Sequence, residues 1–341
     1  MNYKNFTIEG LFKIVLSVAL CLLNVPVMAE KTIDLQGHRG ARGLLAENTL
    51  SSFAAALQSG VTTLELDVVV TQDNILVIHH DPALNPDITR DVGGKFLSGK
   101  GPNIRQMTYQ QLQSYDVGQI RPFTQYARIF ASQKPQDGIR IPRLKDLFEM
   151  VKVGGHQQVN FAIETKITPQ RPDQTPDPEK FVALLLQEIQ SYGLQDRVQI
   201  LSFDWRTLQI VQKMAPKVPT VYVTAQLAVL DNLAINSGRP SEWTAGFQYD
   251  QYGSVPKMIK AAGGTHWSSF WRELDAQKVR EAQELGLKVI AWTVNDRQTM
   301  GQMLDLGVDG LVTDRPDRGC TEFCVNVAGI SSWASCLRTE W

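Results

Sequence analysis

The chain has 341 residues, of which 43% are hydrophobic and 20% charged. This composition excludes a disordered, collagen-like or coiled-coil chain, and the length allows either two ordinary domains or one large α/β barrel. Lysine plus arginine (34) nearly equals aspartate plus glutamate (35), so the formal net charge of −1 gives no electrostatic reason to expect a nucleic-acid partner or adsorption to an anionic membrane.

The first 29 residues have the pattern of a secretory signal peptide. Lys4 and Lys13 precede an apolar run over residues 14–23, and Ala29 offers a small residue at the cleavage position. Because this run is shorter than the ~20 apolar residues of a membrane-spanning helix, we expect cleavage rather than anchoring. The sequence therefore predicts an exported protein, periplasmic or secreted, without stable membrane insertion.

After the leader, short β-branched runs alternate with amphipathic stretches, which is typical of parallel strands joined by helices. The predicted strands span residues 32–37, 63–70, 160–165, 198–203, 220–224, 265–268, 288–294 and 310–313. The predicted helices span residues 49–58, 144–153, 179–192, 205–214, 256–262, 276–285 and 297–306. This pattern predicts a TIM (β/α)8 barrel over residues 30–318, with a doubly wound open sheet as the alternative.

One interval breaks the alternation. After a predicted hairpin strand at 75–79, residues 81–142 pass before the next barrel helix, and they are rich in Gly, Pro and Gln. A connection of this length is usually a functional lid or a small insertion. We expect it to lie over the strand ends.

The four cysteines are placed so that a disulfide could not hold the main body together. Cys21 lies in the leader, whereas Cys320, Cys324 and Cys336 all lie in the tail, residues 319–341. In an oxidising compartment any intramolecular bridge could therefore staple only this tail.

Acidic side chains share one face of two predicted strands. Side chains alternate along a strand, so Glu65 and Asp67 point to one side and their apolar neighbours to the other. The next strand places Glu164, and after it Lys166, on the equivalent face. In a barrel these carboxylates face the lumen, where they repel one another unless a cation lies between them or one binds a proton.

Three carboxylates without cysteine favour one hard divalent cation, Ca²⁺ or Mg²⁺, over zinc. The alternative is a layer of hydrogen-bonded acids without a metal. Lys166 alone would be a salt-bridge partner for Glu164, but beside a metal it suits a phosphate group.

Two histidines lie at predicted strand ends. His38 and Arg39 follow strand 32–37, and His80 follows strand 75–79, while His79 points to the opposite side and is assigned a structural role. Near pH 7 a neutral and a protonated histidine can act as general base and general acid. With a divalent cation, Arg39 and Lys166, these groups are suited to cleaving a phosphodiester.

A set of short motifs in chain order resembles that of the glycerophosphodiester phosphodiesterases over about residues 33–317. The motifs are His38-Arg39-Gly40, Glu47-Asn48-Thr49, Glu65-Leu66-Asp67, His80-Asp81, Glu164-Thr165-Lys166, Leu201-Ser202-Phe203, Ala291-Trp292-Thr293, Asp309-Gly310 and Thr313-Asp314. The resemblance implies hydrolysis of a small-molecule glycerophosphodiester to sn-glycerol 3-phosphate and an alcohol in a TIM barrel.

The resemblance also implies roles for individual residues. It implies a metal held by Glu65, Asp67 and Glu164, and acid/base roles for His38 and His80. It further implies substrate contacts from Arg39, Lys166, Glu47 and Trp292. Two alternatives stay open: a phospholipase-type enzyme acting on intact lipids, which would need an exposed apolar rim, and a catalytically silent glycerophosphodiester-binding protein.

Overall fold

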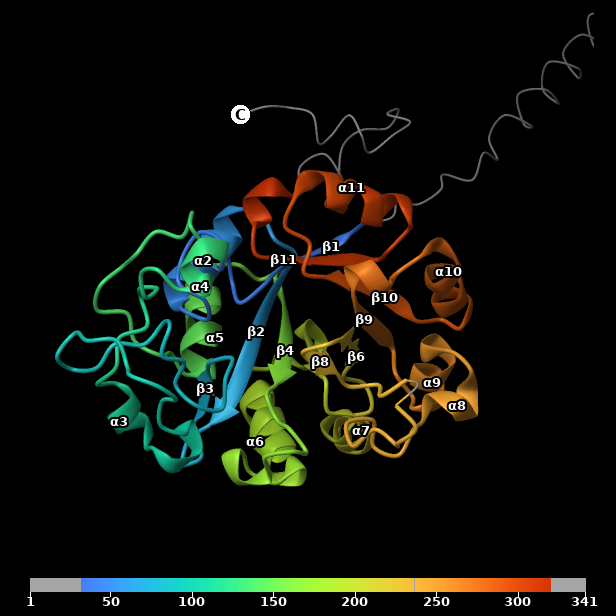
Figure 1. Ribbon diagram of the computed structural model, residues 1–341, viewed down its shortest axis with the longest axis horizontal. Coiled ribbons are helices and arrows are strands. Elements are labelled where there is room, and N and C mark those ends of the chain that lie inside the picture. The colour runs from blue at the N-terminus through green and yellow to red at the C-terminus, as the bar shows by residue number, and fades with distance from the viewer. Residues whose placement is uncertain (1–31, 236, 320–341) are drawn as a thin grey trace, which may run out of the picture. The chain divides into compact units, whose positions relative to one another are not determined.

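Parallel strands close into a barrel in the computed structural model, which describes residues 32–235 and 237–319 (Figure 1). The predicted signal peptide and the three tail cysteines lie outside the described residues. The barrel strands are β1 (Asp34–Gly37), β2 (Thr63–Val70), β4 (Asn160–Thr165), β5 (Val198–Ser202), β6 (Thr220–Thr224), β9 (His266–Phe270), β10 (Lys288–Trp292) and β11 (Gly310–Thr313).

The order of these strands confirms the TIM barrel. The sheet runs β1, β11, β10, β9, β6, β5, β4, β2, and the pairing of β1 with β2 closes the ring. This closing pair is parallel and places Gln36 opposite Thr63 and Gly37 opposite Leu64. The closure rules out the doubly wound open sheet.

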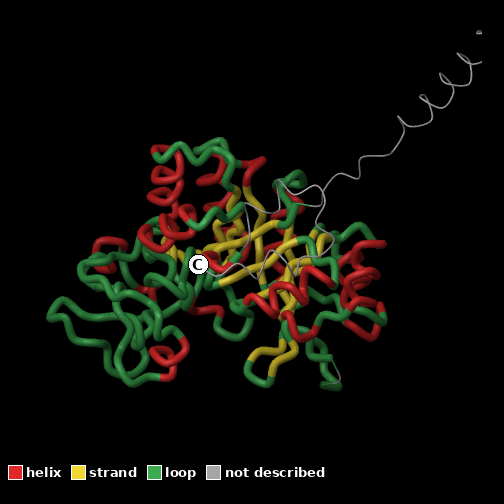
Figure 2. Tube along the Cα trace, turned by 90° about the horizontal axis from the view of Figure 1, so that it is seen from above, coloured by secondary structure: helices red, strands yellow, loops and turns green. Residues whose placement is uncertain are grey.

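Helices surround the strands on the outside (Figure 2). The seven predicted helices are present with bounds that differ from the prediction by at most one residue. They are α2 (Leu50–Gln58), α5 (Leu144–Val153), α6 (Pro178–Ser191), α7 (Trp205–Met214), α9 (Val255–Ala261), α10 (Ala276–Glu284) and α11 (Arg297–Asp305). Most begin after a Thr, Asp or Ser whose side chain accepts a hydrogen bond from the first turn, as Asp177 does from the Lys180 amide. Within the described part of the chain, no helix combines the length and apolarity needed to cross a bilayer.

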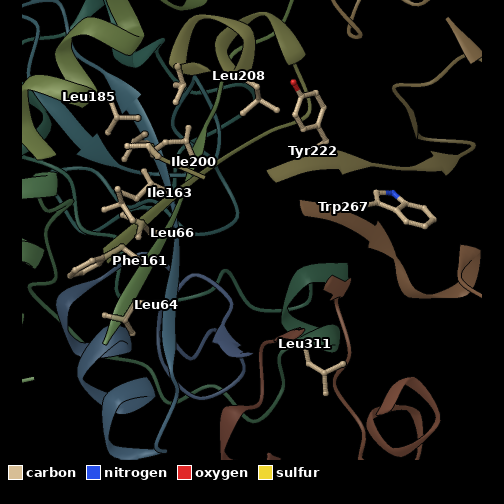
Figure 3. Close-up of a cluster of buried hydrophobic side chains, with 14 of the residues drawn as sticks. Leu64, Leu66, Phe161, Ile163, Leu185, Ile200, Leu208, Tyr222, Trp267 and Leu311 are labelled. Atoms are coloured by element: carbon tan, nitrogen blue, oxygen red, sulfur yellow. The ribbon is translucent and has the colours of Figure 1, made fainter. Parts of the chain in front are cut away.

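The alternation of side chains along the strands builds two apolar layers. Leu64 and Leu66 of β2 lie beside Phe161 and Ile163 of β4 (Figure 3). These side chains face the helices, where they belong to one core with Leu185 of α6 and Leu208 of α7. A second buried set fills the lumen: Ala162, Leu201, Val221, Val223, Ile290 and Val312. Because the outward-facing residues alternate with inward-facing ones, the positions between them on β2 and β4, which include the acids, face the lumen.

The long connection after β2 has a small core of its own. Strand β3 (Leu76–Ile78) pairs antiparallel with β2, and the following residues 81–142 carry the short helices α3 (Tyr109–Leu112) and α4 (Gln125–Ile129). Leu84, Ile104 and Leu112 pack with Val69 of β2 and Val77 of β3. The face of the β2–β3 pair that carries Val69 and Val77, which on β2 is the face of Asp67, therefore supports the insertion. The insertion lies on the left of Figure 1 beside α2 and α5.

Three further short elements lie between β6 and α9. They are strands β7 (Gln226–Leu227) and β8 (Leu230–Asp231), which form a hairpin, and helix α8 (Tyr249–Tyr252). None of them is predicted from the sequence, because segments of two to four residues carry too little periodicity to be recognised.

Candidate active site

The predicted site residues lie where barrel strands end. His38 and Arg39 directly follow β1, Lys166 follows β4, and Trp292 is the last residue of β10. His80 arrives differently, because β3 runs antiparallel to β2 and returns the chain to the level of Asp67. In a parallel barrel the carboxyl ends of all strands meet at one mouth, which is where TIM-barrel enzymes carry their active sites. The closed barrel therefore brings together residues that are far apart in the sequence.

Three carboxylates converge inside this mouth. Asp67 of β2 lies opposite Glu164 of β4 in the strand register, and Glu65 lies two residues earlier on the same face of β2. One oxygen of each lies within 4.8 Å of the others, and all three residues are buried. Asp67 Oδ1 is buried without a hydrogen-bond partner, although the Lys166 Nζ lies 3.6 Å away. An all-oxygen donor set with an unsatisfied buried carboxylate oxygen fits a hard divalent cation.

The electrostatics of this cluster favour an added positive charge. Burial and the negative charges of Asp67 and Glu164 raise the pKa of Glu65 well above its usual value. Burial also disfavours the charged form of Asp67, but the positive charges of Arg39, His80 and Lys166 outweigh it and lower the pKa of Asp67. Without a cation, burial and the neighbouring negative charges thus disfavour the charged form of Glu65.

The loop after β1 holds Arg39 against these acids. Arg39 (φ 51°) and Asn48 (φ 56°) both adopt the left-handed backbone region that non-glycine residues rarely occupy. The Arg39 amide donates a hydrogen bond to Glu65 Oε2 at 2.7 Å, and the Asn48 side chain donates to Asp67 Oδ2 at 2.9 Å. The Arg39 guanidinium donates to Glu47 Oε1 at 2.8 Å. Strained backbone held by several hydrogen bonds is common at functional sites.

His38 is oriented by an aspartate that follows β11. His38 Nδ1 lies 2.7 Å from Asp314 Oδ1, and His38 Nε2 lies 4.0 Å from Glu65 Oε2. Burial disfavours ionisation of Asp314, but Arg42 and His38 lower its pKa below the usual value. Because an ionised carboxylate only accepts hydrogen bonds, Nδ1 carries the proton and Nε2 presents a lone pair toward the acid cluster. Burial, helped by Arg42, lowers the pKa of His38 to about 4, so its ring is neutral at pH 7.

Asp314 is a residue whose role the sequence analysis missed. It also accepts hydrogen bonds from Arg42 Nε at 2.7 Å and Arg42 Nη2 at 3.1 Å, and from Asn295 Nδ2 at 2.7 Å. The available signal was its position directly after the last predicted strand. Its partners, however, come from loops separated from it by up to 276 residues.

His80 lies at a more open part of the mouth. Its side chain is 31% exposed, and its Nδ1 lies 2.7 Å from Asp81 Oδ1. Asp81 is in turn held by the Asn85 side chain at 3.1 Å. The neighbouring His79 is buried, and its amide donates a hydrogen bond to the Asp67 carbonyl at 3.0 Å. His79 thus continues the β2–β3 pairing, whereas His80 reaches solvent beside the carboxylates.

Aromatic side chains form part of the wall of the mouth, and Lys166 Nζ lies 5.8 Å from the centroid of one of them, Phe203. The cavity is lined by His38, Glu65, Glu164 and Trp292 together with apolar lumen residues. The rings of Phe203 and Phe270 pack against Trp292, with centroids 5.7 and 5.6 Å from it. Lys166 Nζ bonds to Glu164 Oε1 at 2.8 Å. The mouth therefore combines an anion-binding side with an apolar side suited to a small organic group.

These features define a class of protein before any comparison. A TIM barrel that carries a three-carboxylate cluster, two imidazoles and two partly buried cations at its carboxyl mouth is suited to hydrolysis of a phosphoric ester. The chain belongs to the glycerophosphoryl diester phosphodiesterase family, whose model matches residues 38–318.

Individual relatives agree with this assignment. The chain is 27% identical over 282 residues to a glycerophosphodiester phosphodiesterase of Caldanaerobacter subterraneus, covering 82% of this chain and 93% of that protein. It is 28% identical over 281 residues to the enzyme of that name from Bacillus altitudinis, covering 82% and 94%. A Silicibacter pomeroyi structure assigned to the same activity is 33% identical with a TM-score of 0.76, covering 86% of this chain and 93% of that one.

Proposed function

We propose that this protein hydrolyses glycerophosphodiesters, such as glycerophosphocholine or glycerophosphoethanolamine, to sn-glycerol 3-phosphate and the free alcohol. The observation that carries the proposal is that His38, held by Asp314, lies beside the three-carboxylate cluster, and that His38, Glu65 and Glu164 line one cavity. A related fold from Oleispira antarctica, 21% identical with a TM-score of 0.61, was solved in complex with the product sn-glycerol-3-phosphate.

Glu65, Asp67 and Glu164 would hold one Ca²⁺ or Mg²⁺. When bound, such an ion neutralises charge on the phosphodiester and so makes the phosphorus easier to attack. Arg39 and Lys166 flank the same carboxylates, and their positive charges suit the remaining phosphate oxygens. Trp292, with Phe203 and Phe270, offers an apolar surface for the glycerol carbons.

His38 and His80 divide the proton transfers. His38 Nε2 takes the proton from the attacking oxygen, and the resulting imidazolium is stabilised by Asp314 at Nδ1. His80, whose Nδ1 is held by Asp81, gives a proton from Nε2 to the departing alkoxide. The P–O bond to the alcohol breaks as the new P–O bond forms. The attacking oxygen belongs either to water or, with a cyclic phosphate formed first, to a glycerol hydroxyl.

A substrate panel tests this proposal. Metal-free protein is assayed for release of glycerol 3-phosphate from several glycerophosphodiesters, first in EDTA and then with Ca²⁺ or Mg²⁺ added back. Turnover that depends on the cation supports the proposal. Tight binding of these substrates without any turnover would instead support a binding protein, and phosphorus NMR would reveal a cyclic intermediate.

Intact lipids are a second candidate class of substrate, because apolar side chains of the insertion are exposed close in sequence to Tyr126. Phe123 is 96% exposed and Ile129 63% exposed, and they flank Tyr126, which contacts Glu47. One relative of this chain, 23% identical over 294 residues, is a human lysophospholipase D. Co-sedimentation with liposomes, together with a lysophospholipid turnover assay, separates this substrate class from the water-soluble diesters.

We also propose that the protein acts outside the cytoplasm, after removal of residues 1–29. The support is the cationic start, the apolar run and the small residue at position 29. Mass spectrometry of the mature protein tests this: an N-terminus at Glu30 supports it, and an intact N-terminus on the native protein contradicts it.

A further inference from the structure

A segment of the insertion, residues 125–136, is fastened to the loop that carries the phosphate-facing arginine. The Tyr126 hydroxyl donates a hydrogen bond to Glu47 Oε2. Gln133 Nε2 donates to the Arg42 carbonyl at 2.7 Å, and the Lys134 amide donates to the Leu44 carbonyl at 2.8 Å. Gln136 Oε1 accepts from the Ser51 hydroxyl at 2.7 Å. These bonds reach residues 42, 44 and 47 of the loop between β1 and α2, and Ser51 in the first turn of α2.

The contact at Tyr126 reaches the site through a single residue. The two oxygens of Glu47 are divided, because Oε1 accepts from Arg39 Nη1 at 2.8 Å while Oε2 accepts from Tyr126. The Glu47 side chain is only 5% exposed, so water does not readily replace the phenol. Tyr126 itself packs against Phe130, and their ring centroids lie 4.7 Å apart. The Arg42 guanidinium lies over the Phe130 ring, 4.5 Å from its centroid.

We propose that Tyr126 is a positioning residue: its hydroxyl fixes the Glu47 carboxylate, which in turn sets the Arg39 guanidinium for the phosphate group. The inference rests on the proposed function for the identity of the substrate, but it requires only that Arg39 binds a phosphate. It also gives the insertion a defined task, since a segment remote in sequence completes the anion-binding side of the mouth.

The geometry predicts which kinetic constant changes. A phosphate carries negative charge both in the bound diester and in the transition state, so a misplaced Arg39 weakens both states together. Loss of interactions made equally in both states raises KM and leaves kcat unchanged. A residue that only supported the fold would instead lower the unfolding temperature without altering phosphate affinity.

The test uses the full-length mature protein with Mg²⁺ present and Tyr126→Phe, which keeps the ring packed on Phe130 and removes only the hydroxyl. The matched control is Tyr115→Phe, because Tyr115 packs in the insertion's own core. The dissociation constant of inorganic phosphate is measured by calorimetry, and KM and kcat are measured for glycerophosphocholine.

In Tyr126→Phe both the phosphate dissociation constant and KM should rise about tenfold, the size of effect expected for one hydrogen bond to a charged acceptor, with kcat unchanged. Tyr115→Phe should change neither constant. In a Glu47→Ala background, adding Tyr126→Phe should cause no further loss, because the two residues act in series.

Unchanged phosphate affinity and KM in folded Tyr126→Phe would overturn the proposal, as would a full additional loss in the Glu47→Ala background. Calorimetry measures phosphate binding without turnover, so a failure of this proposal can be distinguished from a failure of the proposed function. If the wild type binds phosphate but hydrolyses no glycerophosphodiester, the proposed function fails while the role of Tyr126 is still tested.

Discussion

Replacing Glu65 with glutamine should stabilise the metal-free protein while removing its response to a divalent cation. The ligand oxygens of Glu65, Asp67 and Glu164 lie within 4.8 Å of one another, where each pair of charges repels by ~3.5 kcal/mol at an effective dielectric constant of about 20. Arg39 and Lys166 lie close to Asp67 and offset much of this repulsion. Glutamine keeps an oxygen that can accept the bond from the Arg39 amide but carries no charge.

The sign of the effect depends on pH. The pKa of Glu65 is raised in the folded protein, so its contribution to stability is fully present below the usual glutamate pKa and is lost as pH rises through the folded value. Metal-free wild type should therefore lose stability on alkalinisation, and Glu65→Gln should not. At pH 8 we expect Glu65→Gln to be more stable than metal-free wild type by about 1–3 kcal/mol, which is the repulsion that remains after Arg39 and Lys166 offset the rest.

The assay is thermal unfolding in EDTA at pH 5 and pH 8, followed by titration with Ca²⁺ and with Mg²⁺. For the wild type, cation at 100 times its dissociation constant should add ~2.7 kcal/mol, a rise of about 5 °C in Tm for a domain of this size. The matched control is Glu284→Gln on the exposed side of α10, which should behave as wild type. A Glu65→Gln variant that is less stable than metal-free wild type at both pH values, and that the cation still stabilises, would contradict repulsion at Glu65 and its role as a ligand.

Three further predictions follow from the same contacts. His38→Ala and His80→Ala, shown folded by circular dichroism, should each lose ~100- to 10,000-fold in kcat; full cation-dependent activity in either would exclude that histidine as acid or base. Asp314→Asn should lower kcat by ~100-fold and the free energy of unfolding by ~3 kcal/mol, because His38 loses its charged acceptor and Arg42 its buried charge partner. Wild-type kinetics and wild-type stability in denaturant would contradict a role for Asp314 in holding His38 and Arg42. Burial, assisted by Lys288, lowers the pKa of His266 from 6.5 to about 4. The stability that the neutral His266 contributes is therefore present above about pH 6.5 and is lost on acidification toward pH 4, by at most about 3 kcal/mol. Urea unfolding should show a smaller fall in stability from pH 7 to pH 5 for His266→Gln than for wild type, and an equal fall would contradict the role of His266.

The barrel could be predicted closely from the sequence because its signals are local. β2 and β4 begin and end where the alternation of apolar and acidic side chains places them. The same alternation puts Glu65, Asp67 and Glu164 toward the lumen, and a parallel barrel then brings them to one mouth. No distant contact is needed for that inference.

The supporting residues could not be found in this way. Asp314 acts by holding His38, 276 residues away, and Tyr126 reaches Glu47 across 79 residues from a segment without periodicity. Such contacts depend on the paths of loops, and the composition of a loop does not determine its path. What escapes the sequence is therefore the set of residues that orient the reacting groups.

The proposed activity requires that Glu65, Asp67 and Glu164 together bind one divalent cation at the mouth of the barrel. Crystals grown with Mn²⁺, a hard cation detectable by its anomalous scattering, test it most directly. We expect one strong anomalous peak at bonding distance, about 2.2 Å, from an oxygen of each of the three carboxylates. A peak bound elsewhere, or none at this cluster while the protein is active, would contradict it.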